Sequence, residues 1–370
     1  RRQPPQVKQM PPFNYMSASA QTAFANLQGP ALDADLNRSI QSLPGGFSRK
    51  KVRNREYWYF QYKTDGELRQ VYVGPDNESV RALVERHGSQ DAEVAATHLR
   101  ALTRAALALG CVAMPLSHGK VLKRLADYRF FRAGGILIGT HAFLAYQNML
   151  GVAWGAGTIT MDMDFAHPGR NMIIALPADL QIDTQKAIES LEMGFLPNAS
   201  NATYTKADEK DFQLDFVTVQ GRDKDAPQRI ESLNITLQPL KFMEYSMEDV
   251  YQTVALTQDG PVAVNIPAPE RFALHKLIVA GERGGQLATK SHKDIEQAHC
   301  LIEYLAQNRP DALQEAYDDL VARGSGWSKR FEAGLQVLTR KHPDSSFWTA
   351  VRAEDNTNPE HETRVKRARP

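Results

Sequence analysis

One short segment constrains the fold of this chain more than any other: residues 160–166 read Thr-Met-Asp-Met-Asp-Phe-Ala. Its apolar and polar residues alternate, which predicts a β-strand with one buried face. Asp162 and Asp164 then point to the same side, roughly 6–7 Å apart. Two carboxylates this close repel each other unless a cation lies between them, and oxygen ligands suit Mg²⁺ together with a substrate's phosphates. The alternative is a chance Asp-x-Asp sequence in a solvated loop.

An apolar run that ends in Gly139-Thr140 precedes this segment. The run begins at Phe131 and predicts a short strand, and residues 141–150 predict a helix that is closed by Gly151. We expect Thr140 to be the N-cap of that helix. The backbone N–H groups of such a turn can approach a phosphate closely, and the helix dipole adds to the attraction. An ordinary strand-to-helix turn is the alternative.

A third carboxylate lies on a second strand-like run, residues 212–219. The apolar residues of this run share one face: Phe212, Leu214 and Phe216. Asp215 lies on the opposite face. If this strand neighbours the first, Asp215 joins Asp162 and Asp164 around one or two metal ions, the arrangement that nucleotidyl transfer requires. A polar residue on a solvated strand face is the alternative for Asp215.

These residues carry a resemblance to a known superfamily. At Gly139-Thr140, Asp162, Asp164 and Asp215 the chain resembles the DNA polymerase β-like nucleotidyltransferases. Within that superfamily, residues 132–143 and 269–277 are similar to a bacterial family of uncharacterised nucleotidyltransferase-fold proteins. A more distant similarity is to the AbiEii-type toxins of toxin–antitoxin systems, which modify tRNA with nucleotides. Two departures stand out: the acidic pair lies farther from the glycine turn than the superfamily pattern places it, and threonine replaces the usual serine.

The resemblance implies an α+β fold. Its core would be a polymerase β-like nucleotidyltransferase domain, a mixed sheet with helices. An N-terminal helix and β-hairpin region and a C-terminal helical domain would flank it. We expect the following boundaries: an N-terminal arm over 1–45, a basic aromatic β-hairpin over 46–75, a helical segment over 76–130, the catalytic core over 131–265, the C-terminal helical domain over 266–341, and a largely disordered polar tail over 342–370.

The resemblance also implies a reaction, namely transfer of a nucleoside monophosphate from an NTP to an acceptor hydroxyl with two Mg²⁺ ions. Asp162, Asp164 and Asp215 would be catalytic and hold the metal. The acceptor would be RNA, for which a tRNA 3′ end is one candidate, and the enzyme would act in toxicity or defence, with an antitoxin or another partner protein. The same chemistry on a protein or a small molecule is an alternative. A catalytically inactive protein that binds nucleic acid is another.

Residues 267–280 predict a helix that is buried on most sides. Lys276 lies in the middle of it and must either reach solvent or meet an anion, because a buried unpaired ammonium costs several kcal/mol. The resemblance implies that the triphosphate binds over Gly139-Thr140 and Lys276, and extends the nucleotide-binding set to Arg283 and Lys293. A solvated charged face is the alternative for the last two.

Basic and aromatic residues gather near the N-terminus, although the net charge is only +1. Two β-rich runs on either side of Asp65-Gly66 predict a hairpin. Basic side chains beside aromatic rings suit a nucleic acid through phosphate contacts and base stacking. Packing of the rings against the following helices is the alternative. The candidate nucleic-acid-binding residues are Arg49, Lys50, Lys51, Arg53, Arg55, Tyr57 and Tyr59.

Composition sets outer bounds on the class of protein. A chain of 370 residues, 42% of them hydrophobic, can bury two or three domain cores. Cys111 and Cys300 lie far apart and predict buried thiols in a reducing compartment. There is no apolar run long enough to span a bilayer and no visible secretory signal, so we expect a cytoplasmic protein. Zinc-ligand spacing, a Walker loop and internal repeats are absent from the sequence.

Overall fold

A mixed sheet carries the predicted acidic strands. The computed structural model describes residues 11–41, 45–52, 55–64, 67–86, 92–155, 160–169, 182–221, 225–283 and 288–352. The strands of this sheet, in spatial order, are β11 (Gln228–Ile230), β12 (Ile235–Leu240), β10 (Glu209–Val219), β7 (Met163–Ala166) and β5 (Ile136–Leu137), with β9 (Thr203–Lys206) on β10 and β8 (Phe195–Pro197) on β9. β10 runs parallel to β7 and β12, whereas β5 runs antiparallel to β7. The fold is therefore mixed α+β.

Alternating apolar residues bury one face of this sheet. Met163 and Phe165 of β7 and Leu214 and Phe216 of β10 have no exposed surface. The rings of Phe165 and Phe216 are register partners and stack with centroids 5.2 Å apart. The helices around this core are α4 (Leu116–Asp127), α5 (Gly139–Leu150), α6 (Thr184–Glu189) and α7 (Met243–Met247), with the short 3₁₀ helix η1 (Glu231–Leu233). The buried side of α4 belongs to the same apolar core as the sheet.

A separate hairpin, β13 (Val250–Thr257) with β14 (Gly260–Pro267), lies between the core and the N-terminal helices. The N-terminal elements are β1 (Phe13–Tyr15), which pairs with β6 (Val152–Trp154), and the helices α1 (Ala18–Gln41), α2 (Glu78–Arg86) and α3 (Ala92–Ala108). α1 packs along α3, and both contact the β13–β14 hairpin. A buried ion pair of 2.6 Å between Arg132 and Asp35 ties α1 to the turn before β5.

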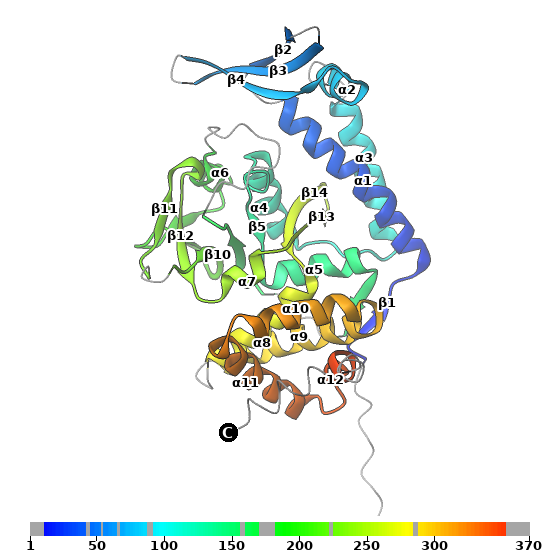
Figure 1. Cartoon of the computed structure of the whole chain (residues 1–370), viewed down its shortest axis with the longest axis vertical. Helices are drawn as coiled ribbons and strands as arrows, with labels where there is room; N and C mark the ends of the chain where they lie inside the picture. The colour runs from blue at the N-terminus through cyan, green and yellow to red at the C-terminus, as the bar shows by residue number, and fades with distance from the viewer. Residues whose placement is uncertain are drawn as a thin grey trace, which may run out of the picture.

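α1 and α3 lead away from the core to a three-stranded antiparallel sheet (Figure 1). Its strands are β2 (Gly45–Val52), β3 (Arg55–Thr64) and β4 (Glu67–Pro75). β3 and β4 form the predicted hairpin, although its turn residues, 65 and 66, lie outside the described residues. The sequence did not predict β2, which takes up most of the basic cluster. This strand places the cluster at one edge of the sheet.

Five helices follow the β13–β14 hairpin and lie at the opposite end of the molecule from the β2–β4 sheet (Figure 1). They are α8 (Pro269–Arg283), α9 (Ala288–Asn308), α10 (Pro310–Ala322), α11 (Ser325–Lys341) and α12 (Phe347–Arg352). α12 falls in the segment that we expected to be a polar tail, and its Phe347 has no exposed surface. No described helix is both long and apolar enough to cross a membrane.

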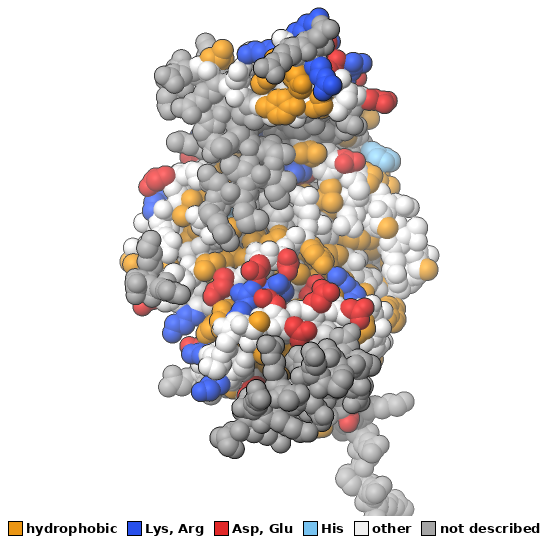
Figure 2. All heavy atoms as spheres, in the orientation of Figure 1, with side chains coloured by type: hydrophobic (Ala, Val, Ile, Leu, Met, Phe, Trp, Pro, Cys, Tyr) orange, Lys and Arg blue, Asp and Glu red, His pale blue; other side chains and the backbone are white. Residues whose placement is uncertain are grey.

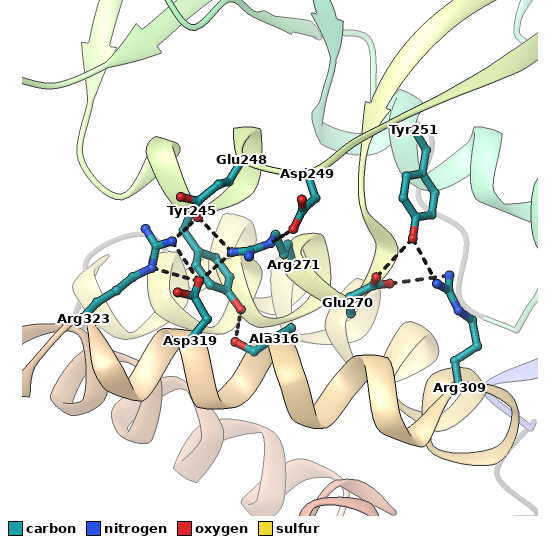
Figure 3. A network of polar contacts seen from close by, with 10 residues as sticks. All are labelled: Tyr245, Glu248, Asp249, Tyr251, Glu270, Arg271, Arg309, Ala316, Asp319 and Arg323. Carbon is teal, nitrogen blue, oxygen red and sulfur yellow. Dashed lines mark hydrogen bonds and ion pairs between the residues drawn. The ribbon is translucent and has the colours of Figure 1, made fainter.

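A polar network fastens these helices to the core (Figure 3). Arg271 of α8 pairs with Glu248 at 3.2 Å and with Asp319 of α10 at 2.7 Å. The hydroxyl of Tyr245 on α7 donates to the carbonyl of Ala316 at 2.7 Å, and the Arg271 guanidinium lies 4.9 Å from the centre of the Tyr245 ring. These contacts join α7, α8 and α10, so the position of α8 relative to the sheet is held on several sides.

Four local predictions can be compared with the structure. Thr140 is not the N-cap of α5: the helix begins at Gly139 and Ile138 occupies the cap position. The predicted strand from Phe131 is also wrong in length, because only Ile136–Leu137 pair with β7 while the preceding residues form turns. The predicted C-terminal glycine is confirmed, since Gly151 closes α5 in the left-handed conformation with φ of +70°. Both cysteines are free and buried, as predicted.

Candidate active site

Asp164 lies at the centre of the candidate site. It is on β7, and its register partner on the parallel neighbour β10 is Asp215, so their Cα atoms are roughly 4.8 Å apart in the hydrogen-bonding direction. Asp162 precedes the first residue of β7 and lies two positions from Asp164. The strand order thus fulfils the condition set by the sequence, that the strand of Asp215 neighbours the strand of Asp164. The apolar residues between them point into the core and leave the acids on the other face.

Gly139 lies directly against the Asp164 side chain. The N–H of Ile138 donates to the carbonyl of Asp164 at 3.0 Å, which brings the start of α5 over β7. Gly139 has φ of +62°, and a Cβ placed on it would be 2.1 Å from Oδ2 of Asp164. Only glycine combines this backbone conformation with so close an approach to the carboxylate. The predicted glycine turn and the predicted acidic strand therefore meet at atomic contact.

The surroundings of Asp164 oppose its ionisation. Burial and the neighbouring charge of Asp162 raise the pKa of Asp164 to about 6, and Asp215 contributes in the same direction. Lys276 and Lys293 act in the opposite direction and lower the pKa. Three acids and two lysines thus interact at one place, from segments far apart in the sequence. A cation beside Asp164 would relieve the unfavourable interactions among the carboxylates.

Lys276 projects from α8 into a buried ion network. Its Nζ lies 2.6 Å from Oδ1 of Asp294 on α9, and the other oxygen of that carboxylate pairs with Arg283. Burial alone would raise the pKa of Asp294, but the charges of Lys276 and Arg283 lower it. One alternative was that Lys276 reaches solvent. Instead, its ammonium group pairs with the Asp294 carboxylate. Asp294 itself is enclosed, because its side chain is only 4% exposed.

Lys293 approaches the acids from α9. Burial lowers the pKa of Lys293, whereas Asp162 and Asp164 favour its charged form. The three basic residues of the predicted nucleotide-binding set thus fall into two roles. Lys276 and Arg283 share Asp294, and Lys293 is influenced most strongly, among charged groups, by Asp162. Together they surround the carboxylates with positive charge on the side of α8 and α9.

Thr140 is less accessible than its predicted role requires. Its side chain is 1% exposed, and its Oγ1 accepts a hydrogen bond of 3.3 Å from Nε2 of Gln297 on α9. No described side chain caps the start of α5. The N–H groups of the first turn of α5, rather than the Thr140 hydroxyl, are therefore the donors that this turn offers to an anion.

A pair of histidines lies beneath the start of α5. Nε2 of His141 and Nδ1 of His118 are 2.8 Å apart, and both rings are buried. Burial lowers the pKa of His141 to about 3, and His118 adds to the effect. His141 is therefore neutral near pH 7, which fits a structural role beside the turn rather than that of a base which exchanges protons with solvent.

Asp215 is held by a hydroxyl group. Oγ1 of Thr203 on β9, the register partner of Asp215 on that side, donates to Oδ1 at 2.6 Å. Among the described residues, no three His, Cys, Asp or Glu side chains form a ready-made metal cluster. Mg²⁺ does not need one, because it takes one or two carboxylates and completes its shell with water and phosphate oxygens. The oxygen-only donor set and the mutual repulsion at Asp164 fit such an ion.

The predicted nucleic-acid-binding residues lie away from this site. The β2–β4 sheet that carries them stands at the far end of α1 (Figure 1). Arg53 lies outside the described residues. The other six are on β2 and β3: Arg49, Lys50, Lys51, Arg55, Tyr57 and Tyr59.

Four residues at the site were absent from the predicted set: Asp294, Gln297, His118 and Thr203. The only local signal for Asp294 was its place beside Lys293, because its partners Lys276 and Arg283 lie on the preceding helix. For Gln297, His118 and Thr203 there was none, because each is defined by a partner on another element. These residues hold Lys276, Thr140, His141 and Asp215 in place.

A family model described as nucleotidyltransferase matches residues 117–322, which is more than half of the chain. The matched region contains all the predicted catalytic and nucleotide-binding residues. A second model, described as a domain of unknown function, matches residues 30–82, which contain the β2–β4 sheet. The comparisons with curated proteins and with solved structures gave no match.

Proposed function

The chain belongs to this nucleotidyltransferase family and is a transferase enzyme, and from this premise we propose that it moves a nucleoside monophosphate from an NTP to a hydroxyl of an RNA acceptor with the help of Mg²⁺. The observation that carries the proposal is the register of Asp164 with Asp215 on parallel strands, with Asp162 and two lysines acting on the same carboxylate. An inactive binding protein would gain nothing from a buried set of like charges.

Asp162, Asp164 and Asp215 would hold the metal, with two ions as the expected number. When bound, Mg²⁺ neutralises the charge of the triphosphate and polarises the reacting phosphate. The donor set supports this assignment, because all three residues offer carboxylate oxygens. The elevated pKa of Asp164 also supports it, since a cation would favour the charged form that burial and Asp162 disfavour.

The nucleotide would lie with its triphosphate over the first turn of α5. Gly139 lets the backbone approach closely there, and the N–H groups of the turn offer hydrogen bonds to phosphate oxygens. Lys276, Lys293 and Arg283 would add positive charge from the side of α8 and α9. Asp294 holds the first and last of these by ion pairs, so their charged groups are already oriented.

In the transfer step the acceptor oxygen forms a bond to the α-phosphorus while the bond to the leaving pyrophosphate oxygen breaks. The proton of the acceptor hydroxyl passes to Asp215, which is the base we assign. The hydrogen bond from Thr203 to Oδ1 of Asp215 keeps one carboxylate oxygen in place. Positioning and charge stabilisation supply the catalysis, as in other phosphoryl transfers.

RNA is the acceptor we favour, with a tRNA 3′ end as one candidate. The basic, aromatic β2–β4 sheet supports a nucleic acid, and the distant resemblance to AbiEii-type toxins supports tRNA and a role in toxicity or defence. An antitoxin or other partner protein in the cytoplasm would accompany such a role. A protein or small-molecule acceptor would use the same carboxylates but would not account for the basic, aromatic β2–β4 sheet.

The test is transfer of label from each α-³²P-NTP, with Mg²⁺, into cellular RNA and into lysate protein. We expect one preferred nucleotide and a labelled RNA band. Asp164→Asn should abolish the label, whereas Asp208→Asn, an acid on an exposed turn with a side chain 77% exposed, should not. Label in protein alone would replace RNA as the acceptor, and full activity of Asp164→Asn would remove the assigned site.

A further inference from the structure

The β2–β4 sheet has two faces of different character. Paired residues of antiparallel strands point to the same face, so the strand registers sort the side chains. Arg49 pairs with Trp58, and Lys50 pairs with Tyr57. Tyr59 pairs with Ser48 on one side and with Tyr72 on the other. Neighbouring basic residues of β2 therefore lie on opposite faces.

One face packs against the start of α2. The indole N–H of Trp58 donates to Asp76 at 2.8 Å, and Phe60 on the same face is only 4% exposed. Arg49 pairs with Glu56 at 3.0 Å and with Asp76 at 3.6 Å. The charge of Arg49 is thus matched by carboxylates, which differs from its predicted role as a contact to nucleic acid.

The other face is open and carries three tyrosines. Tyr72 is 54% exposed, and its ring centre lies 6.0 Å from that of Tyr57 and 5.7 Å from that of Tyr59. The Lys50 ammonium lies 5.3 Å from the centre of the Tyr59 ring. We call Tyr57, Tyr59, Tyr72 and Lys50 the tyrosine face. Lys and Arg side chains lie beside apolar ones at this end of the molecule (Figure 2).

We propose that the tyrosine face binds a single-stranded segment of the acceptor RNA, at a distance from the carboxylates. The proposal rests on the proposed function for the identity of the acceptor. Three adjoining rings with a lysine beside them offer stacking to bases and charge to a phosphate, and every base has a face that can stack. Arg55, exposed at the start of β3, extends the positive charge along the same face.

The position of the sheet explains why a long acceptor would be selected. α1 has 24 residues and is therefore about 36 Å long. It runs from β1, beside the core, to β2 (Figure 1). A nucleotide or small molecule at the carboxylates could not also touch the tyrosine face, whereas an RNA could. A separate family model matches residues 30–82, outside the nucleotidyltransferase match at 117–322.

The test is fluorescence anisotropy of the full chain with a labelled single-stranded RNA of about 16 nucleotides. We expect Tyr72→Ala to weaken binding about tenfold through the loss of stacking. Lys50→Gln should lower the slope of log affinity against log salt by about 0.7 through the loss of one phosphate contact. Melting curves check that each variant is folded. We expect Tyr72→Ala to fold because Tyr72 is 54% exposed.

Two variants serve as matched controls. Tyr15→Ala removes a tyrosine of similar exposure, 56%, from β1, and Arg49→Gln removes the neighbouring charge from the other face. Both should bind RNA as the wild type does. Wild-type affinity in Tyr72→Ala and Lys50→Gln, or an equal loss in the two controls, would overturn the proposal, as would tighter binding of duplex RNA or of an acidic peptide. Because anisotropy needs no catalysis, absence of label transfer would count against the proposed function alone.

Discussion

At the scale of single residues, the account depends on Asp164. Its carboxylate touches Gly139, faces Asp215 across two parallel strands and interacts with Lys276 and Lys293. Burial and like charge make the ionised form unfavourable in the absence of a cation. A group retained under such conditions contributes to binding rather than to stability. The effect of Asp164 on binding and its effect on stability can be measured separately.

Asp164→Asn should stabilise the protein when no divalent cation is present. The folded-state pKa of about 6 lies above the ordinary value of 3.8, so the folded protein holds this proton more tightly than the unfolded chain. The wild type therefore loses stability as pH rises from about 4 to about 6. We expect the variant to gain roughly 3 kcal/mol at about pH 7.5 and less than about 1 kcal/mol at about pH 4. Urea titrations in EDTA measure this, and equal gains at both pH values would contradict it.

Gly139→Ala should disable the site by moving the Asp164 carboxylate. The new methyl group would occupy the place of Oδ2, and a displacement of about 1 Å in a catalytic group costs around a hundredfold in rate. Gly194→Ala is the control, since Gly194 has φ of +77° but nothing within 4 Å of its added Cβ. The two variants share backbone strain, so only Gly139→Ala should lose transfer activity. Equal activities in the two variants would argue against the contact.

At the scale of elements, two helices deliver the positive charge. α8 carries Lys276 and Arg283, and α9 carries Lys293 and Asp294. The carboxylate of Asp294 bridges both helices, so it orients the cations and ties α8 to α9 at once. A bridge of this kind is weak evidence for net stability, but its loss leaves buried charges without a partner.

Asp294→Asn should therefore destabilise the fold by about 3 kcal/mol and weaken the thermal stabilisation that NTPs give. The matched control is Glu209→Gln, which removes one carboxylate from the ion pair with Lys206 at 3.1 Å, where the Glu209 side chain is 43% exposed. Exposed pairs contribute no more than about 1 kcal/mol. Urea unfolding compares the two variants. An Asp294→Asn variant as stable as the control would mean that the network is not needed to hold α8 on α9.

The sequence predicts the elements that have a local pattern, but not the features that depend on contacts with other elements. The acidic strands were predictable, because alternation of Met163 and Phe165 with Asp164 is a local signal. The N-cap was not: Thr140 has the right chemistry, but Gly139 already begins the helix and the Thr140 hydroxyl contacts Gln297. β2 was missed because its basic run includes Lys50 and Lys51, which are poor strand formers, and the strand is stabilised by pairing with β3.

At the scale of the whole molecule, the site is assembled from segments that are distant in the sequence. The turn before α5, the strands β7 and β10, and the helices α8 and α9 meet at one place. The network of Arg271 with Glu248 and Asp319 holds the helical end (Figure 3), and the Arg132–Asp35 pair holds α1. The sequence predicted the parts of the site, but not these links, because each joins residues whose proximity only the fold creates.

The most direct test of the account is the single-turnover rate of nucleotidyl transfer in Asp162→Asn, Asp164→Asn, Asp215→Asn and the triple variant. If the three carboxylates act as one unit, each single change should lower the rate at least about a thousandfold. The triple variant should then be no slower than the slowest single variant, because groups that act together are not additive. Any one of the single variants reacting within about tenfold of the wild-type rate would contradict the assignment of these residues as one metal-binding and catalytic site.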